Sequence, residues 1–243
     1  LTMLSLFTNS HLFNAFSIRI RITISSLYSN YRSIFKKKNI LLIMREFILL
    51  ALKARTSPDF DLAKLPEAGS LDLVCLTILN TLWISNNIRR DTAIHIALNG
   101  PEFPPKIIRF YGKSLKGCEP DEVTIAKCIK KALKEGLNLE LNEEKEVSLG
   151  IKVSKKAFET LVKEKSKTSQ LIYLHPEGED IRKFNFKQNI TFILGDYIGL
   201  PRKTEKLLDR LEAKRIKLGP LTLFASHCPI LVHNELDRKE NSK

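Results

Sequence analysis

The segment that most constrains the fold is an apolar run near the carboxyl end that stops at a glycine. Residues 190–194 have the composition of a buried strand, and the turn Gly195-Asp196-Tyr197-Ile198-Gly199 follows at once. A second apolar segment, Leu218 to Phe224, runs into a helix that is expected to open at residues 225–229. Strands that end in bare backbone beside small residues are typical of the carboxyl edge of an α/β sheet, where ligands bind. Because these segments contain no phosphate loop and no charged cradle, they suit an adenosine-type cofactor.

Strand and helix patterns alternate along the chain from Met44 onward. The patterns predict strands at 47–52, 92–98, 107–110, 171–175, 190–194 and 214–218. They predict helices at 71–85, from 120 to the glycine at 136, at 154–165, at 204–212 and after 225. Pro120 is expected as a first helical residue, and Ser154 as the cap of the helix after it. This alternation favours an α/β fold built on a mainly parallel sheet.

The first 43 residues differ from the rest in composition. They contain no Asp or Glu, and their cations are Arg19, Arg21, Arg32 and Lys36-Lys37-Lys38. We expect residues 1–43 to be an extension outside the fold, either disordered or lying upstream of a true start at Met44. An organelle transit peptide is the alternative, since such peptides are also poor in acids and contain Arg and Ser. The domain is expected to span residues 44–243.

Composition and charge restrict the class of protein. With 43% apolar and 28% charged residues, the chain can bury a core as a soluble globular protein. A formal net charge of +13 indicates a polyanionic partner such as RNA, although a solvated lysine-rich surface explains the charge equally well. Arg45 and Glu46 interrupt the apolar run 40–52, which is far shorter than the roughly 20 residues that a membrane span needs. No membrane helix is expected.

Several familiar motifs are absent or incomplete. The four cysteines are widely spaced and the histidines show no metal-binding spacing, so we expect no metal, no disulfide framework and a reducing cytoplasm. Gly112-Lys113-Ser114 resembles the end of a phosphate loop, but Ile107 stands where the first glycine of that loop would be. The chain is therefore not expected to be a phosphate-loop ATPase.

The loop Ile88-Arg89-Arg90-Asp91 is a candidate for chemistry because it lies between a predicted helix and a predicted strand. Arg90 could hold a phosphate, and Asp91 could orient that group or accept a proton. A structural ion pair between Arg and Asp is the alternative.

Five motifs occur in a fixed order along the chain. They are Met44-Arg45-Glu46-Phe47; Ile88-Arg89-Arg90-Asp91; Leu174-His175-x-x-Gly178-Glu179-Asp180; Leu194-Gly195-Asp196-Tyr197-Ile198-Gly199; and Leu218-Gly219-Pro220-Leu221-x-Leu223-x-Ala225-x-His227-Cys228 closing on His233-Asn234-x-Leu236-Asp237. This set resembles the archaeal tRNA pseudouridine-N1 methyltransferases of the SPOUT superfamily. The resemblance covers residues 44–239 and does not extend to residues 1–43.

The resemblance implies a SPOUT fold with a C-terminal trefoil knot that binds S-adenosyl-L-methionine. It also implies a cytoplasmic, archaeal enzyme that acts on tRNA as a homodimer, in which each chain completes the active site of the other. Carried over by motif, the cofactor-binding residues are Leu174, Gly195, Leu218, Gly219, Pro220, Leu221, Thr222, Leu223 and Cys228.

The reaction implied is methylation of N1 of pseudouridine 54, in the T-loop. Asp91 is expected to accept the N1 proton or anchor the base, and Arg90 to grip a phosphate. Cys228 is expected to line the pocket, since direct transfer needs no covalent intermediate. The alternatives are a SPOUT methyltransferase acting on ribosomal RNA pseudouridine, and a non-catalytic basic RNA-binding protein.

Overall fold

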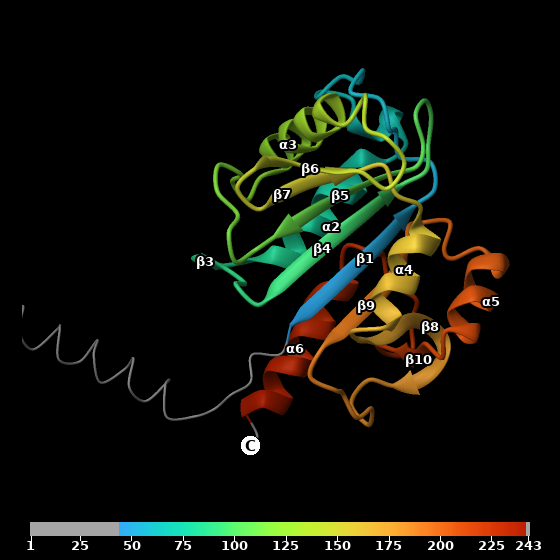
Figure 1. The fold of residues 1–243 in the computed structure, drawn as a ribbon. Helices are drawn as coiled ribbons and strands as arrows, with labels where there is room; N and C mark the ends of the chain where they lie inside the picture. Colours follow the sequence, from blue (N-terminus) through green and yellow to red (C-terminus); the bar gives the residue numbers. More distant parts are fainter. Residues whose placement is uncertain (1–43, 242–243) are drawn as a thin grey trace, which may run out of the picture. The chain divides into compact units, whose positions relative to one another are not determined.

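The computed structural model describes residues 44–241, so the expectations for residues 1–43 lie outside the described residues. Within the described range, an eight-stranded sheet has the order β10-β8-β9-β1-β4-β5-β7-β6 (Figure 1). Its strands are β1 (Arg45–Ala51), β4 (Thr92–Leu98), β5 (Lys106–Tyr111), β6 (Glu144–Ser148), β7 (Ile151–Ser154), β8 (Gln170–Asp180), β9 (Ile190–Gly195) and β10 (Lys214–Lys217). The helices are the short 3-10 helix η1 (Leu65–Ala68), α2 (Leu71–Leu82), α3 (Glu122–Glu135), α4 (Phe158–Ser166), α5 (Arg202–Arg210) and α6 (Cys228–Asn241). A small hairpin, β2 (Trp83–Ile84) with β3 (Asn87–Ile88), stands apart from the sheet.

The sheet has a parallel half and an antiparallel half. Strands β10, β8, β9, β1 and β4 pair in parallel, whereas β5, β7 and β6 are added in antiparallel pairs beyond β4. The α/β fold is confirmed, and its parallel half contains the strand ends that the sequence marks as a ligand site.

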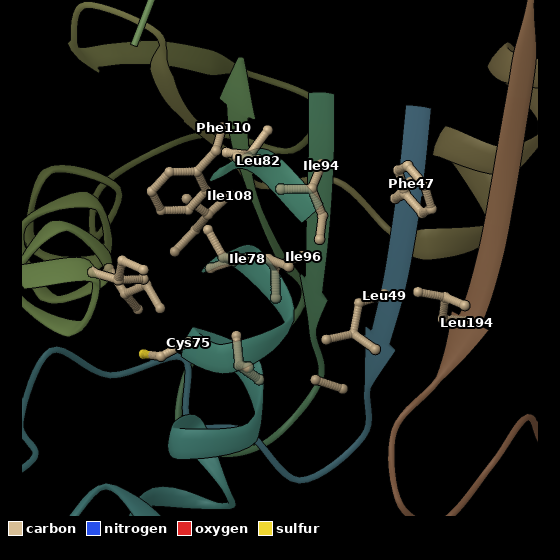
Figure 2. Close-up of a cluster of buried hydrophobic side chains, with 14 of the residues drawn as sticks. Phe47, Leu49, Cys75, Ile78, Leu82, Ile94, Ile96, Ile108, Phe110 and Leu194 are labelled. Carbon is tan, nitrogen blue, oxygen red and sulfur yellow. The ribbon is translucent and has the colours of Figure 1, made fainter. Parts of the chain in front are cut away.

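Helices cover both faces of the parallel half. Phe47 and Leu49 of β1 belong to the core shared with α2, α3 and α6, and Figure 2 shows Ile78 of α2 beside the strand residue Ile96. The alternate residues Ile48 and Leu50 pack with α4 and α5 on the opposite face. Strands buried on both faces read as continuous apolar runs, which explains the uninterrupted patterns at 47–51 and 190–194.

Two predicted helix starts are wrong. Pro120 precedes α3, and Asp121 is its N-cap, whose carboxylate accepts a hydrogen bond from the amide of Thr124. Ser154 caps no helix, because it is the last residue of β7. The β6–β7 hairpin was missed because β6 is a mostly exposed edge strand with the charged sequence Glu-Lys-Glu, which lacks an apolar alternation.

Other local expectations concern thiols and membrane helices. All four cysteines are free. Between residues 44 and 241, no helix combines the length and apolar character needed to cross a membrane.

Candidate functional site

The carboxyl ends of β1 and β9 are joined by the Asp196 side chain. One carboxylate oxygen accepts a 2.8 Å hydrogen bond from the amide of Leu52, just after β1. The other accepts a 2.8 Å bond from the amide of Ile198, within the turn after β9. The backbone amide of Asp196 also donates to the Leu50 carbonyl at 3.1 Å. Two of these bonds therefore hold the turn against the end of the central strand, and the third closes the turn on itself.

The turn after β9 requires glycine at both ends. A Cβ atom at Gly195 would lie 2.4 Å from the carbonyl carbon of Gly199, closer than side-chain contacts allow. Gly199 has φ +83°, in the left-handed region that favours glycine. The chain is thus folded back on itself with exposed backbone, an arrangement that lets a ligand approach the main chain closely.

A narrow recess, partly open to solvent, lies between this turn and α2. Its lining residues are Leu49, Ser70, Leu73, Val74, Thr77, Asp196, Tyr197, Phe224, Ala225 and Ser226. The lining residue Phe224 is 63% exposed, and Leu221, three residues before it in the chain, is 75% exposed. Apolar side chains that gather at one exposed place typically mark a binding site. The recess and these side chains together suit a flat, partly apolar ligand such as an adenosine.

None of the predicted cofactor residues lines this recess, but several of them directly precede residues that do. Gly195 directly precedes the lining residues Asp196 and Tyr197, and residues 218–223 directly precede the lining residues 224–226. Leu174 lies in β8, half-buried against the core on the α2 face. Cys228 begins α6, where burial raises the pKa of its thiol to about 11, so the thiol is neutral and a poor nucleophile.

The described residues contain no arrangement of three or more His, Cys, Asp or Glu side chains that could hold a metal ion.

The Arg90–Asp91 loop lies at the other end of the central strands, where β1 and β4 begin. Asp91 precedes β4, whose first residue Thr92 pairs with Arg45 at the start of β1. Gly195 pairs with Leu50 near the end of β1. Arg45 and Leu50 are five positions apart along β1, which corresponds to roughly 17 Å at about 3.3 Å per residue. Within one chain, the structure does not bring Asp91 and Arg90 to the recess.

Arg90 and Asp91 do not pair with each other. The exposed guanidinium of Arg90 donates to the carbonyl of Lys113 at 3.1 Å. One Asp91 oxygen lies 3.4 Å from Nε of Arg45, and the other accepts a 3.1 Å bond from the Thr92 hydroxyl. The structural Arg–Asp ion pair that the sequence left open exists, but its arginine is Arg45.

Arg45 is the centre of a buried ionic cluster. Its side chain is 1% exposed, and its guanidinium lies 2.6 Å from Asp237 and 2.8 Å from Glu240 of α6. Burial would lower the pKa of Arg45, but the hydrogen bonds to Glu240 and Asp237 raise it. Arg89 also binds Asp237, at 2.7 Å. The first, second and last motifs of the sequence therefore meet in one cluster. The sequence analysis missed this role of Arg45, although a charged residue at the start of an apolar strand was a signal for it.

His233 completes this cluster as a neutral side chain. Its Nδ1 accepts from the Arg45 guanidinium at 3.2 Å, which leaves Nε2 to donate to the Thr81 carbonyl at 3.0 Å. Burial, reinforced by the charges of Arg89 and Arg45, lowers the pKa of His233 to about 3. The histidine therefore links β1, α2 and α6 without carrying a charge.

Known proteins resemble this chain over nearly all of its described length. Residues 44–241 match the family model described as "Putative SAM-dependent RNA methyltransferase". The tRNA (pseudouridine(54)-N(1))-methyltransferase of Methanocaldococcus jannaschii is 43% identical over 201 residues, which cover 81% of this chain and 98% of the relative. The enzyme of the same name from Methanococcoides burtonii is 40% identical over 203 residues, covering 82% and 99%.

A solved structure shares the fold. Archaeoglobus fulgidus Nep1, bound to S-adenosylhomocysteine, aligns with a TM-score of 0.55 and 13% identity, covering 81% of this chain and 99% of Nep1. The likeness confirms the SPOUT-type α/β fold that the ordered motifs predict.

Proposed function

This chain belongs to the family of SAM-dependent RNA methyltransferases, and we propose that it methylates N1 of pseudouridine 54 in tRNA. The observation that carries the proposal is the identity of 40–43% to enzymes of that name over 98–99% of their length. The basic charge of +13 supports an RNA substrate, because phosphates dominate the affinity of proteins for nucleic acids.

The residues around the recess fit S-adenosyl-L-methionine. The main chain of residues 195–199 and 218–223 would bind the adenosine part, with Leu174 and Cys228 as apolar lining. Asp196 supports this site indirectly by fixing the turn to β1. When bound, the cofactor supplies an electrophilic methyl group, so the protein's task is to orient the base toward it and to assist departure of the N1 proton.

We assign that assistance to Asp91, as proton acceptor or anchor for the base, and phosphate binding to Arg90. Since about 17 Å of strand separates Asp91 from Gly195 within one chain, the assignment requires a second copy. We therefore propose a homodimer in which the Arg90–Asp91 loop of one chain completes the cofactor site of the other.

We further propose a C-terminal trefoil knot, an archaeal origin and a cytoplasmic location. The path of the chain supports the knot. After β9 in the sheet interior the chain forms β10 at the edge beyond β8, and it then returns to pack His233 of α6 against Phe47 of β1, with ring centroids 5.1 Å apart. The relatives named above come from archaea, and tRNA modification is consistent with the cytoplasm.

The activity is tested with the purified full chain, S-adenosyl-L-methionine and two tRNA transcripts, one with pseudouridine at position 54 and one with uridine. Nucleoside mass spectrometry should find N1-methylpseudouridine only in the first. Methylation of a ribosomal RNA pseudouridine in preference to the tRNA would support the ribosomal alternative. Failure to bind S-adenosyl-L-methionine in a calorimetric titration would support the non-catalytic alternative.

The dimeric site is tested by mixing two inactive variants. Gly195→Val should disable cofactor binding and Asp91→Asn should disable catalysis, so each alone is inactive. If the sites are shared between chains, unfolding and refolding the two together should restore about a quarter of the wild-type activity, since half of the dimers are mixed and carry one intact site. No recovery, in dimers shown to have exchanged subunits, would contradict the shared site.

A further inference from the structure

A second hollow lies on the α4 face of the sheet, away from the recess at α2. His95 of β4, Arg109 of β5 and Lys152 of β7 occupy one row across neighbouring strands. Ile108 and Phe110, on either side of Arg109, point into the core with α2 and α3. Because strand side chains alternate between faces, Arg109 points to the α4 side.

The hollow is partly open to solvent and is lined by residues of strands β4 to β7 and of α4. Its lining residues are His95, Ile107, Arg109, Glu144, Lys152, Ser154, Lys156, Leu161, Glu164 and Lys165. Unlike the recess at α2, it is lined mainly by charged and polar groups.

The charges of the hollow do not balance. Lys152 binds Glu144 and Lys156 binds Glu164, both at 2.8 Å. Lys165 binds Glu46, just outside the lining. Within the described part of the chain, Arg109 alone of the lining cations lacks a carboxylate within ion-pair distance, and its guanidinium instead lies 5.0 Å from the ring centre of Tyr111. One positive charge with several free donors is therefore left facing the hollow.

Arg109 also acts on Glu144. Burial would raise the pKa of Glu144, but the hydrogen bond from Lys152 and the charges of Lys152 and Arg109 lower it. Glu144 consequently remains ionised. Its ion pair is with Lys152, and it forms no ion pair with Arg109.

Two buried side chains add neutral groups to the hollow. The side chain of Ser154 is 5% exposed and lines the hollow, where its hydroxyl can meet water or a ligand. His95 is 4% exposed; its Nε2 lies 3.3 Å from Glu46, and burial lowers the pKa of His95 so that the ring is neutral.

We propose that this hollow binds a phosphate group of the RNA substrate, a phosphodiester of the tRNA backbone outside the methylated loop. The unpaired, forked guanidinium of Arg109 and the hydroxyl of Ser154 are donors suited to phosphate oxygens. The inference rests on the proposed function, since it takes the polyanion to be tRNA.

The position of the hollow supports an RNA backbone as the source of the phosphate. Gly195, Leu50, Ala97, Ile107 and Ser154 form one continuous row across five strands. At about 4.8 Å between strands, Ser154 lies roughly 19 Å from the Gly195 turn. A bound tRNA arm spans that distance within a few nucleotides, whereas a free phosphate ion gains nothing from it.

The test measures the affinity for tRNA as a function of salt concentration. The full-length protein is compared with its variants Arg109→Gln, Arg109→Lys and Ser154→Ala. The matched control is Arg210→Gln, at an exposed position of α5. Arg109→Gln should weaken tRNA binding about tenfold and lower the magnitude of the salt slope by about one unit. Arg109→Lys should keep the slope but lose part of the affinity, because a lysine retains the charge without the fork. Ser154→Ala should weaken binding a few-fold at an unchanged slope.

Two further readouts separate the possible failures. Affinity for S-adenosyl-L-methionine and methyl transfer by the wild-type protein test the proposed function, and all variants should retain the cofactor affinity. If Arg109→Gln matches Arg210→Gln in tRNA affinity and slope while wild-type activity is intact, the inference is wrong and the proposed function stands. If Arg109→Gln abolishes only the binding of inorganic phosphate, followed by phosphorus NMR, a free phosphate is the ligand and the assignment to RNA is overturned.

Discussion

Nη1 of Arg45 lies 2.6 Å from Oδ1 of Asp237 and so ties the first residue of β1 to the last helix of the domain. The arginine is 1% exposed, whereas the aspartate is 37% exposed. Asp237 therefore neutralises a guanidinium that is shielded from water, and this ion pair connects the two ends of the described chain.

Arg45→Gln should destabilise the fold strongly. The change leaves the carboxylates of Asp91, Asp237 and Glu240 close together with one cation fewer, and breaking a buried ion pair costs about 3–5 kcal/mol. Chemical unfolding should report that loss. Arg182→Gln is the matched control, because Arg182 pairs with Asp180 but is itself 76% exposed, so its loss should leave the stability nearly unchanged. Equal stability of the two variants would show that the cluster is not structural.

Stability should fall as the pH drops below about 6.5, the ordinary pKa of histidine, because folded His233 has a pKa of about 3. In that window the unfolded chain takes up a proton that the folded chain excludes, so folding weakens by about 1.4 kcal/mol per pH unit, or about 2 kcal/mol by pH 5. His95, whose pKa is also lowered by burial, acts in the same direction.

Urea unfolding between about pH 5 and pH 8 measures this linkage. His233→Gln should reduce the slope of stability against pH, while His227→Gln, at an exposed position, should leave it unchanged. A slope that His233→Gln does not alter would mean that His233 is not held neutral.

Gly195→Ala should abolish binding of S-adenosyl-L-methionine by deforming the turn, since its Cβ would lie 2.4 Å from the Gly199 backbone. Gly219→Ala is the contrasting variant, because nothing lies within 4 Å of a Cβ there. It should leave the melting temperature unchanged, so any loss of cofactor affinity would report direct contact with the ligand. Calorimetric titration and melting curves check both. Unchanged affinity in Gly195→Ala would remove this turn from the site.

Arg90→Ala should weaken tRNA binding and lower the magnitude of the salt slope by about one unit. Melting temperature and cofactor affinity should not change, because Arg90 is exposed and donates only to the Lys113 carbonyl. Filter binding over a range of salt concentrations measures the slope, with Arg210→Ala as the matched arginine. A large loss of stability in Arg90→Ala would instead make this residue part of the scaffold.

The sequence predicted the parallel half of the sheet better than the antiparallel half. Strands β1, β4 and β9 are buried on both faces, so their apolar runs identify them and place the glycine turn at a strand end. Strand β6 has no buried residue and a charged sequence, which carries no such signal.

The candidate site could be located from the sequence only in part. The glycines mark the backbone turn, but the partner of Asp91 depends on contacts between residues far apart in the chain. Arg45 lies next to Asp91 only because β1 and β4 are neighbours, a pairing that no local pattern encodes.

The ion pairs between Arg45 and α6 have a consequence for how the protein folds during synthesis. Arg45 and His233 are separated by 188 positions, and Arg45 and Glu240 by 195. During synthesis, the first strand leaves the ribosome long before the helix that neutralises its charge exists. The contacts of Arg45 with α6 can form only after that helix has been synthesised, which favours slow folding governed by long-range contacts.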